Sequence, residues 1–268
     1  MLFEKVCFVS VSGGKDSTLT LALALEKYRG TDVPVIAVFA DTHWEHPLTY
    51  KYLDQLEEFF GIRIQRLSGY NGGLPELIKK KRIFPSPRRR FCTQILKSKI
   101  FRKLYLWTYL HFPFKVAEVW QGIRREESRS RRNVSDLVLK AGEKRFGERY
   151  PFDVHFIYPI KNLRERQVFE ELKKRGIPIN PLYEQGFKRV GCYPCFISKK
   201  DIVQVILKAL EGDRFAVQRL KEMKELDCLI ASKFYINHTL NELIEQAKAR
   251  KEKADRIKKY LLPLPFPK

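Results

Sequence analysis

The chain has 268 residues, 44% of them hydrophobic and 13% aromatic, which excludes wholesale disorder and allows a sizeable core. Its 52 Lys and Arg against 31 Asp and Glu give a net charge of +21, an imbalance that favours a polyanionic partner because neutralised phosphates release counterions. No run approaches the ~20 apolar residues of a membrane span. Because residues 1–10 show strand character without a secretory cleavage region, we expect an intact cytoplasmic protein with no membrane partner.

Residues 6 to 67 alternate between strand and helix patterns. Strands are expected at Val6–Val11, Val33–Ala40 and Ile62–Leu67, and helices at Ser17–Tyr28 and Leu48–Phe60. The second strand is a continuous apolar run, as in a strand that is buried on both faces. This order predicts an α/β fold with a doubly wound, Rossmann-like parallel sheet.

The rest of the chain carries fewer strand patterns. Gly69–Phe91 is rich in Gly, Pro and basic residues, so we expect an irregular loop that covers a site and adds nothing to the core. Further elements are expected at Thr93–Leu110, Ala117–Gly122, Phe156–Ile160 and Leu163–Arg175. Residues 197–268 are helical and highly charged in pattern. We therefore expect a nucleotide-binding domain at 1–196 and a C-terminal helical appendage at 197–268.

The segment between the first strand and the first helix has the composition of an anion-binding loop. It comprises Ser12, Gly13, Gly14, Lys15, Asp16 and Ser17. Glycines let successive N–H groups turn inward, and the helix N-terminus adds free donors and a positive dipole end. Lys15 supplies a charge, and Asp16 is suited to hold Mg²⁺ or to cap the helix. The spacing differs from G-x-x-x-x-G-K-[ST], which disfavours a kinase-type site.

Two further polar segments directly follow predicted strands. The first contributes Asp41, Thr42 and Glu45, and the second contributes Gly122, Arg124, Glu127, Ser128 and Arg131. The carboxyl ends of parallel strands lie at one edge of a sheet, so these residues should converge on the loop at 12–17. Arg124 and Arg131 are suited to grip phosphate or sulfate oxygens, with Glu127 orienting Arg124.

These segments resemble the PP-loop ATP pyrophosphatase superfamily, and within it the PAPS-reductase-like family. Asp41–Thr49 resembles D-T-x-x-E-x-P-x-T, and Gly122–Arg131 resembles G-x-R-x-x-E-S-x-x-R. Asn180–Cys195 resembles N-P-L-Y-x-x-G-F-x-R-x-G-C-x-x-C. The resemblance implies a PP-loop fold that uses ATP or PAPS with Mg²⁺, the nucleotide being held by the loop and by the two polar segments. It implies catalytic roles for Lys15, Asp16, Arg124 and Glu127.

The cysteines favour metal or redox chemistry over a disulfide framework, since their number is odd and Cys192-x-x-Cys195 is one tight pair. Cys92 stands where the family carries one or two cysteines before a Leu-Lys pair. Convergence of Cys92, Cys192 and Cys195 would suit a [4Fe–4S] cluster or Zn²⁺ with one further ligand. Redox thiols without a metal remain an alternative. Cys7 is expected in the core, and Cys228 is a poor fourth ligand.

Three functions account for these patterns. The first is a sulfurtransferase that adenylylates tRNA or DNA with ATP, releases pyrophosphate and AMP, and inserts sulfur. In it, the nucleic acid would be held by Arg88, Arg89, Arg90 and Lys97. The second is a PAPS or APS reductase, which the missing C-terminal E-C-G-x-H element disfavours. The third is a nucleotide- or nucleic-acid-binding subunit. The sulfur donor and the oligomeric state, a homodimer included, are left open.

Overall fold

The computed structural model describes residues 2–143, 149–230, 232–235 and 237–261, and centres on a six-stranded sheet. The strands are β1 Phe3–Val11, β2 Val35–Asp41, β3 Ile64–Ser68, β4 Phe114–Gln121, β5 Leu137–Leu139 and β6 Asp153–Ile157. Their order is β3-β2-β1-β4-β6-β5, and all neighbours pair in parallel except β5 with β6. The predicted doubly wound α/β sheet is therefore confirmed.

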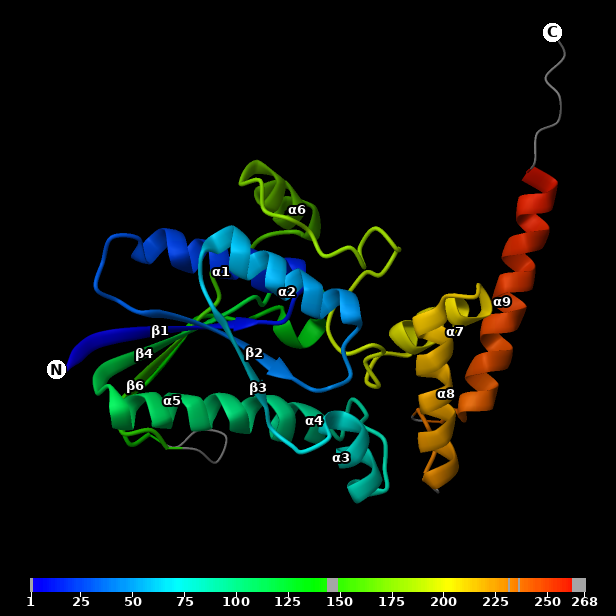
Figure 1. Cartoon of the computed structure of the whole chain (residues 1–268), viewed down its shortest axis with the longest axis horizontal. Coiled ribbons are helices and arrows are strands. Elements are labelled where there is room, and N and C mark those ends of the chain that lie inside the picture. The colour runs from blue at the N-terminus through cyan, green and yellow to red at the C-terminus, as the bar shows by residue number, and fades with distance from the viewer. Residues whose placement is uncertain (1, 144–148, 231, 236, 262–268) are drawn as a thin grey trace, which may run out of the picture.

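Helices cover both faces of the sheet (Figure 1). On one face lie α1 Lys15–Tyr28, α2 Pro47–Phe60 and α6 Glu165–Lys174, and on the other lies α5 Lys99–His111. Alternate residues of β1 point to opposite faces, so Cys7 and Val9 pack beneath α1 and α2, whereas Val6 and Phe8 pack against α5. Cys7 is fully buried in the core, as expected.

The register brings the predicted site segments to one edge. Val11 pairs with Phe39 of β2, and Ser10 pairs with Gln121 of β4. The chain leaves β1, β2 and β4 at the same edge, where the loops 12–14, 42–46 and 122–124 begin. This edge is the place where ligands bind in open parallel sheets.

The segment at 69–91 differs from its prediction. It contains the helix α3 Gly73–Lys81, and Leu74, Leu77, Ile78 and Phe84 are all buried in a hydrophobic cluster. The expectation of an irregular loop without core residues was wrong. Pro75 stands in the first turn of α3, where a missing N–H breaks no intrahelical bond, so its presence did not exclude a helix.

The bounds of two other elements differ from their predictions. The last parallel strand, β6, runs from Asp153 to Ile157 rather than from 156 to 160, and the short antiparallel strand β5 was not foreseen. The helix expected at 93–110 begins as a short turn, α4 Phe91–Thr93, followed by a π-helical turn, η1 Gln94–Ser98, before α5. Short 3₁₀ turns, η2 Arg125–Glu127 and η3 Arg129–Arg131, follow β4.

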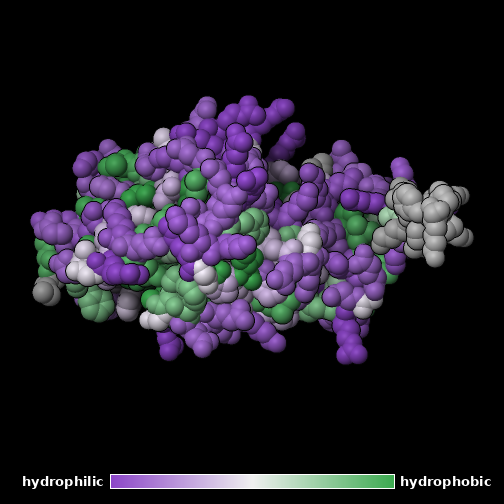
Figure 2. Space-filling view, turned by 90° about the horizontal axis from the view of Figure 1, so that it is seen from above, coloured by the Kyte–Doolittle hydropathy of each residue, from purple (hydrophilic) through white to green (hydrophobic). Residues whose placement is uncertain are grey.

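The C-terminal region is helical, as expected, and comprises α7 Lys199–Leu210, α8 Arg214–Leu229 and α9 Leu240–Leu261 (Figure 1). Its buried side chains share one hydrophobic cluster with α3 and with residues 182–196. The hydrophobic core thus includes residues on both sides of position 196. The division into two domains at this position stays a prediction. Among the described residues, no helix combines the length and apolar character needed to cross a membrane. The face in Figure 2 is mostly hydrophilic, with small scattered hydrophobic patches.

Candidate active site

The loop 12–14 is shaped by close backbone contacts. Gly13 has a φ of +74°, and a Cβ there would lie 2.7 Å from Thr49 Cγ2 of α2. Gly14 is the residue before α1 and caps it without a side chain. The left-handed backbone and the nearby threonine methyl together exclude a larger residue at Gly13.

Three hydrogen bonds connect the backbone of this loop and of the first residue of α1 to side chains. Ser12 N donates to Ser17 Oγ at 3.0 Å, and Lys15 N donates to Tyr183 Oη at 3.0 Å. Asn180 Nδ2 donates to Gly13 O at 3.0 Å. Asn180 and Tyr183 were noted only as letters of a motif, and their contacts with the loop are not visible in the sequence. The Tyr183 hydroxyl thus accepts the first backbone N–H of α1.

Four charged side chains meet beside the loop, and we call them the phosphate corner: Lys15, Asp16, Arg124 and Glu165. Lys15 Nζ lies 3.2 Å from Asp16 Oδ2 and 3.1 Å from Glu165 Oε1. Arg124 Nε donates to Asp16 Oδ1 at 2.5 Å. Lys15 and Arg124 are each only 4% exposed, so two buried cations share one carboxylate.

Gly122 joins this corner to the sheet. A Cβ on it would lie 2.6 Å from Asp16 C and 2.7 Å from Ser17 N, so the end of β4 touches the backbone of the first turn of α1. The contact explains a glycine here without requiring that it bind a ligand itself. It also fixes where the chain that carries Arg124 enters the corner.

The segment after Arg124 is more exposed. Glu127 Oε2 accepts a hydrogen bond from Arg124 N at 3.0 Å and pairs with Arg131. Glu127 therefore contacts the backbone of Arg124, while Asp16 holds its guanidinium. Ser128 Oγ lies 3.0 Å from Ser130 Oγ, at the surface. Arg124 Nη1 is buried without a hydrogen bond among the described residues and lies 3.5 Å from Glu126 Oε2.

A second group of polar residues follows β2. Asp41 Oδ1 accepts from Tyr50 Oη and from His43 N, each at 2.8 Å. Glu45 is buried, and its carboxylate accepts from Thr42 Oγ1 at 2.6 Å and from Trp44 N at 3.1 Å. Burial raises the pKa of Glu45 despite these hydrogen bonds.

His46 serves as the N-cap of α2, because its Nδ1 accepts from Leu48 N at 3.1 Å. Its ring contacts Tyr193 and Phe215 at centroid distances of 4.8 and 4.5 Å. Burial lowers the pKa of His46 to about 4, with Arg219 adding in the same direction and Asp213 opposing it. His46 is thus a buried, neutral N-cap.

Cys192 lies beside Glu45, and Cys92 and Cys195 both act electrostatically on Lys97 nearby. We call this group the cysteine corner: Glu45, Cys92, Lys97, Cys192 and Cys195. Cys192 Sγ is 3.4 Å from Thr42 Oγ1 and 3.9 Å from Glu45 Oε1. Burial raises the pKa of Cys92, and the charge of Cys195 adds in the same direction. The charges of Cys192 and Glu45 raise the pKa of Lys97 against the effect of its burial. The ammonium group of Lys97 is thus placed among the cysteines and Glu45.

The cysteine corner does not form a finished metal site. Among the residues that the structure describes, no three Cys, His, Asp or Glu side chains are arranged to hold a metal ion. Cys192 Sγ faces Thr42 and Glu45, which are oxygen groups rather than further thiols. The side chains as placed therefore do not fit a cluster on three thiolates. Cys228 is exposed on α8.

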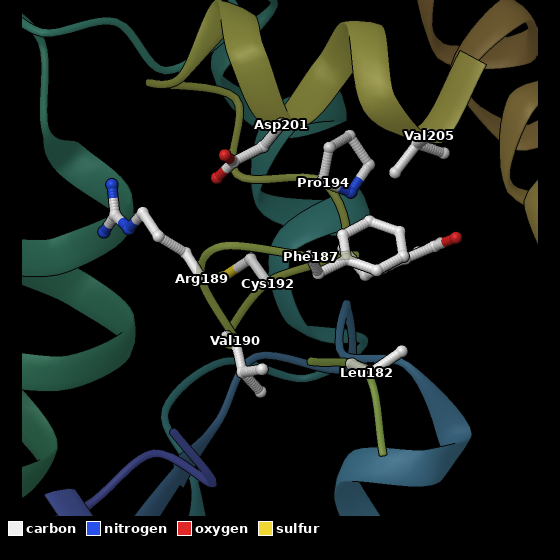
Figure 3. A pocket seen from close by; sticks show the side chains of 10 residues that line it. Leu182, Phe187, Arg189, Val190, Cys192, Pro194, Asp201 and Val205 are labelled. Atoms are coloured by element: carbon white, nitrogen blue, oxygen red, sulfur yellow. The ribbon is translucent and has the colours of Figure 1, made fainter. Parts of the chain in front are cut away.

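A small pocket lies behind Cys192 (Figure 3). Leu182, Phe187 and Val205 supply apolar walls, and Arg189 and Asp201 extend away from Val205 toward the opposite side (Figure 3). The pocket is lined by residues between 182 and 205 and by no residue of the phosphate corner.

Arg88, Arg89 and Arg90 are all exposed, in a turn closed by hydrogen bonds between Ser86 and Arg89.

Comparisons with known proteins find similar sequences over about 70% of the chain. The family model of the phosphoadenosine phosphosulfate reductase domain matches residues 6–197. The chain is 33% identical over 236 residues to an uncharacterized 37.8 kDa protein of Escherichia phage 186, covering 72% of this chain and 67% of that protein. It is 29% identical over 201 residues to adenosine 5'-phosphosulfate reductase of Pseudomonas aeruginosa, covering 72% and 67%. A phosphoadenylyl-sulfate reductase structure from Candida auris aligns at 18% identity with a TM-score of 0.49, covering 70% and 81%.

Proposed function

The chain belongs to the phosphoadenosine phosphosulfate reductase domain family, and from this premise we propose that it is an ATP-dependent sulfurtransferase acting on nucleic acid. The observation that carries the proposal is the phosphate corner. Lys15 and Arg124 are buried cations at the carboxyl edge of the sheet, beside a helix N-terminus. Such a corner stabilises charge that develops on a phosphate in the transition state.

The residues of the corner suit distinct roles. Lys15 and Arg124 neutralise phosphate oxygens, and Arg124 Nη1 is a buried donor that has no hydrogen bond among the described residues and is available to a ligand. Asp16 orients Arg124 and is the carboxylate we assign to Mg²⁺. Glu127 acts through the backbone of Arg124. Asp41 at the end of β2, Glu45 on the neighbouring loop and the half-buried Arg131 add to the nucleotide contacts that we propose.

The first step would be adenylylation. A carbonyl oxygen of a nucleic-acid base attacks the α-phosphorus of ATP, the bond between that phosphorus and the bridging oxygen breaks, and pyrophosphate leaves. A sulfur nucleophile then attacks the activated carbon, the carbon–oxygen bond breaks, and AMP leaves. The protein's part is to position both substrates and to stabilise phosphate charge.

The cysteine corner is the proposed place of sulfur delivery. The motif assigns Cys92, Cys192 and Cys195 to a [4Fe–4S] cluster or Zn²⁺, and holding either would require these side chains to leave the positions that they have here. Because the described side chains are not arranged as metal ligands, we derive no step through such a group. If Cys92 takes part in sulfur delivery, a Cys92→Ser variant loses sulfur insertion while nucleotide binding persists.

The nucleic-acid substrate is supported by charge. The net charge of +21 exceeds what one nucleotide would need, and Arg88, Arg89 and Arg90 form an exposed basic turn. Removing one phosphate-binding cation should lower the slope of the salt dependence by about one unit. Replacing all three arginines by Gln should therefore weaken tRNA or DNA binding and flatten its salt dependence, with ATP affinity unchanged.

A second candidate is a reductase that releases sulfite, and the names of the reductase relatives favour it. That reaction needs a thiolate to attack sulfur. Cys228 lies on the exposed surface of α8 and has no neighbouring glycine or histidine in the sequence. The candidate therefore depends on a cysteine of the cysteine corner acting as the nucleophile.

One anaerobic experiment separates the two candidates. The protein is given ATP, Mg²⁺ and a sulfide donor with bulk tRNA or DNA, and separately PAPS with a thiol reductant. We expect pyrophosphate and AMP only when nucleic acid is present, and neither product from Lys15→Met. Sulfite released from PAPS, without nucleic-acid-dependent pyrophosphate, would overturn the transferase in favour of the reductase.

A further inference from the structure

A buried arginine of the C-terminal helices reaches back to the loop after β2. Arg219 lies on α8, outside residues 6–197 that the family model matches, and is 5% exposed. Its Nη1 is 3.0 Å from Glu222 Oε2 on the same helix. Few arginines are buried so deeply unless their contacts require it, so the other contacts of this guanidinium are informative.

Those contacts are with Trp44 and Glu45. The Arg219 Cζ atom lies 3.7 Å from the centre of the Trp44 ring, which is a cation–π contact, and Nη2 donates to Glu45 O at 3.4 Å. Within the same short segment, the Glu45 carboxylate accepts from the backbone N–H groups of Thr42 and Trp44. The loop 42–46 is thus held by hydrogen bonds to the Glu45 carboxylate within it and by the contacts of Arg219 on α8.

Trp44 also connects this loop to the segment 192–196. Its Nε1 donates to Pro194 O at 3.1 Å, its carbonyl accepts from Tyr193 N at 2.7 Å, and its ring stacks on Phe196 at 5.5 Å. A displacement of the indole would therefore move the loop 42–46, which bears Glu45, together with the segment at 192–196.

We propose that Arg219 is a positioning residue, through which the C-terminal helices hold the loop 42–46 and the segment 192–196 in place. The helices are then part of the site rather than an appendage to it. The consequence for nucleotide affinity rests on the proposed function, whereas the consequence for the order of the loop does not.

An arginine suits this role better than a lysine does. A planar guanidinium stacks on the indole and presents a fixed fork of donors, so it contacts the ring and the Glu45 carbonyl at once. A lysine ammonium is a point charge on a flexible stem and offers no planar face. Arg219→Lys should therefore restore only part of what Arg219→Met loses.

Two readouts on the full chain test the proposal. The first is hydrogen exchange of the amides of residues 42–46 and 193, relative to those of β1. The second is the Kd for ATP with Mg²⁺. The matched controls lie on the same helix: Met223→Ala, which makes a cavity in the shared core, and Arg214→Met, which removes an exposed positive charge.

Arg219→Met should speed exchange in both segments at least tenfold and raise the Kd for ATP about tenfold, with Arg219→Lys in between. The controls should leave the ratio of exchange rates and the Kd within twofold, even where Met223→Ala lowers Tm. Unchanged exchange in Arg219→Met, or equal effects in Met223→Ala, would overturn the proposal. If the wild type binds neither ATP nor PAPS, the proposed function fails, and the exchange comparison still decides the role of Arg219.

Discussion

The two corners of the site are built in different ways. The phosphate corner is held by backbone contacts, since Gly13 and Gly122 lie against Thr49 and the first turn of α1. The cysteine corner is held by side chains from distant elements, with Trp44 packed on Arg219 and bonded to Pro194. A close backbone contact requires a glycine, which can be recognised in a sequence motif. A contact between side chains that are far apart in the sequence produces no local pattern.

The largest effect is expected where backbone atoms meet. Gly122→Ala places a methyl group 2.6 Å from Asp16 C, so the first turn of α1 must shift. Overpacking of this kind costs about 3 kcal/mol in the free energy of unfolding. Chemical denaturation measures it. Gly176→Ala, with a φ of +64° and no atom within 4 Å, is the control and should cost about 1 kcal/mol.

The free energy of unfolding should depend on pH through His46. The pKa of His46 is about 4 in the folded state against an ordinary value of 6.5. The unfolded chain therefore binds more protons between these values, so stability falls as the pH drops from about 6.5 toward 4, by about 2 kcal/mol at pH 5. Thermal unfolding at pH 7 and pH 5 measures this loss.

The matched variant is His46→Asn, which keeps a capping acceptor for α2 but cannot titrate. It should be less stable at pH 7, because no ring remains to pack on Tyr193 and Phe215. Its stability should change less than that of the wild type between pH 7 and pH 5. An equal fall in both proteins would show that another group governs this range.

Asn180 links the two corners, because it contacts the loop at 12–14 from the segment that leads to the cysteines. Its Nδ2 donates to Gly13 O, and its Oδ1 accepts from Leu182 N, both at 3.0 Å. Asn180→Ala should cost about 1 to 2 kcal/mol of unfolding free energy, because it removes two buried hydrogen bonds. Urea denaturation measures this, and a cost below about 0.5 kcal/mol would contradict the assigned hydrogen bonds.

The smallest effect concerns Tyr183, whose hydroxyl occupies the Lys15 N–H. Tyr183→Phe should lower stability by about 1 kcal/mol and tighten ATP binding about fivefold, since a phosphate oxygen would then satisfy the freed donor. Calorimetric titration of both proteins measures the change. Weaker binding in the variant would instead mean that the hydroxyl contacts the nucleotide.

The sequence predicted which segments meet at the carboxyl edge of the sheet, although it did not point to Glu165. Glycines and polar residues stand directly after buried strands, and strand ends converge by geometry, so the positions of Ser12, Asp41 and Gly122 followed from the strand pattern. The role of Glu127 was less predictable, because the choice between the guanidinium and the backbone of Arg124 depends on the turn that follows β4.

The cysteine corner was only partly predictable. Motifs placed Cys92, Cys192 and Cys195 in one region, but the pairing of Cys192 with Thr42 and Glu45 depends on an antiparallel bridge between residues 45 and 192. Arg219 lies 175 residues after Trp44 in the sequence, and no motif in α8 indicates that the two side chains are in contact. The helix α3 was missed because glycines and a proline at its start outweighed its short apolar pattern.

The proposed role of the phosphate corner is decided by its affinity for nucleotide. Calorimetric titration with ATP and Mg²⁺, and with PAPS, is compared for the wild type, Lys15→Met and Lys79→Met, in which an exposed lysine paired with Glu76 is removed. A charged hydrogen bond contributes about 1.5–3 kcal/mol, so Lys15→Met should bind about 10- to 100-fold more weakly, and Lys79→Met as the wild type does. A folded Lys15→Met protein that binds both nucleotides with wild-type affinity would contradict this role.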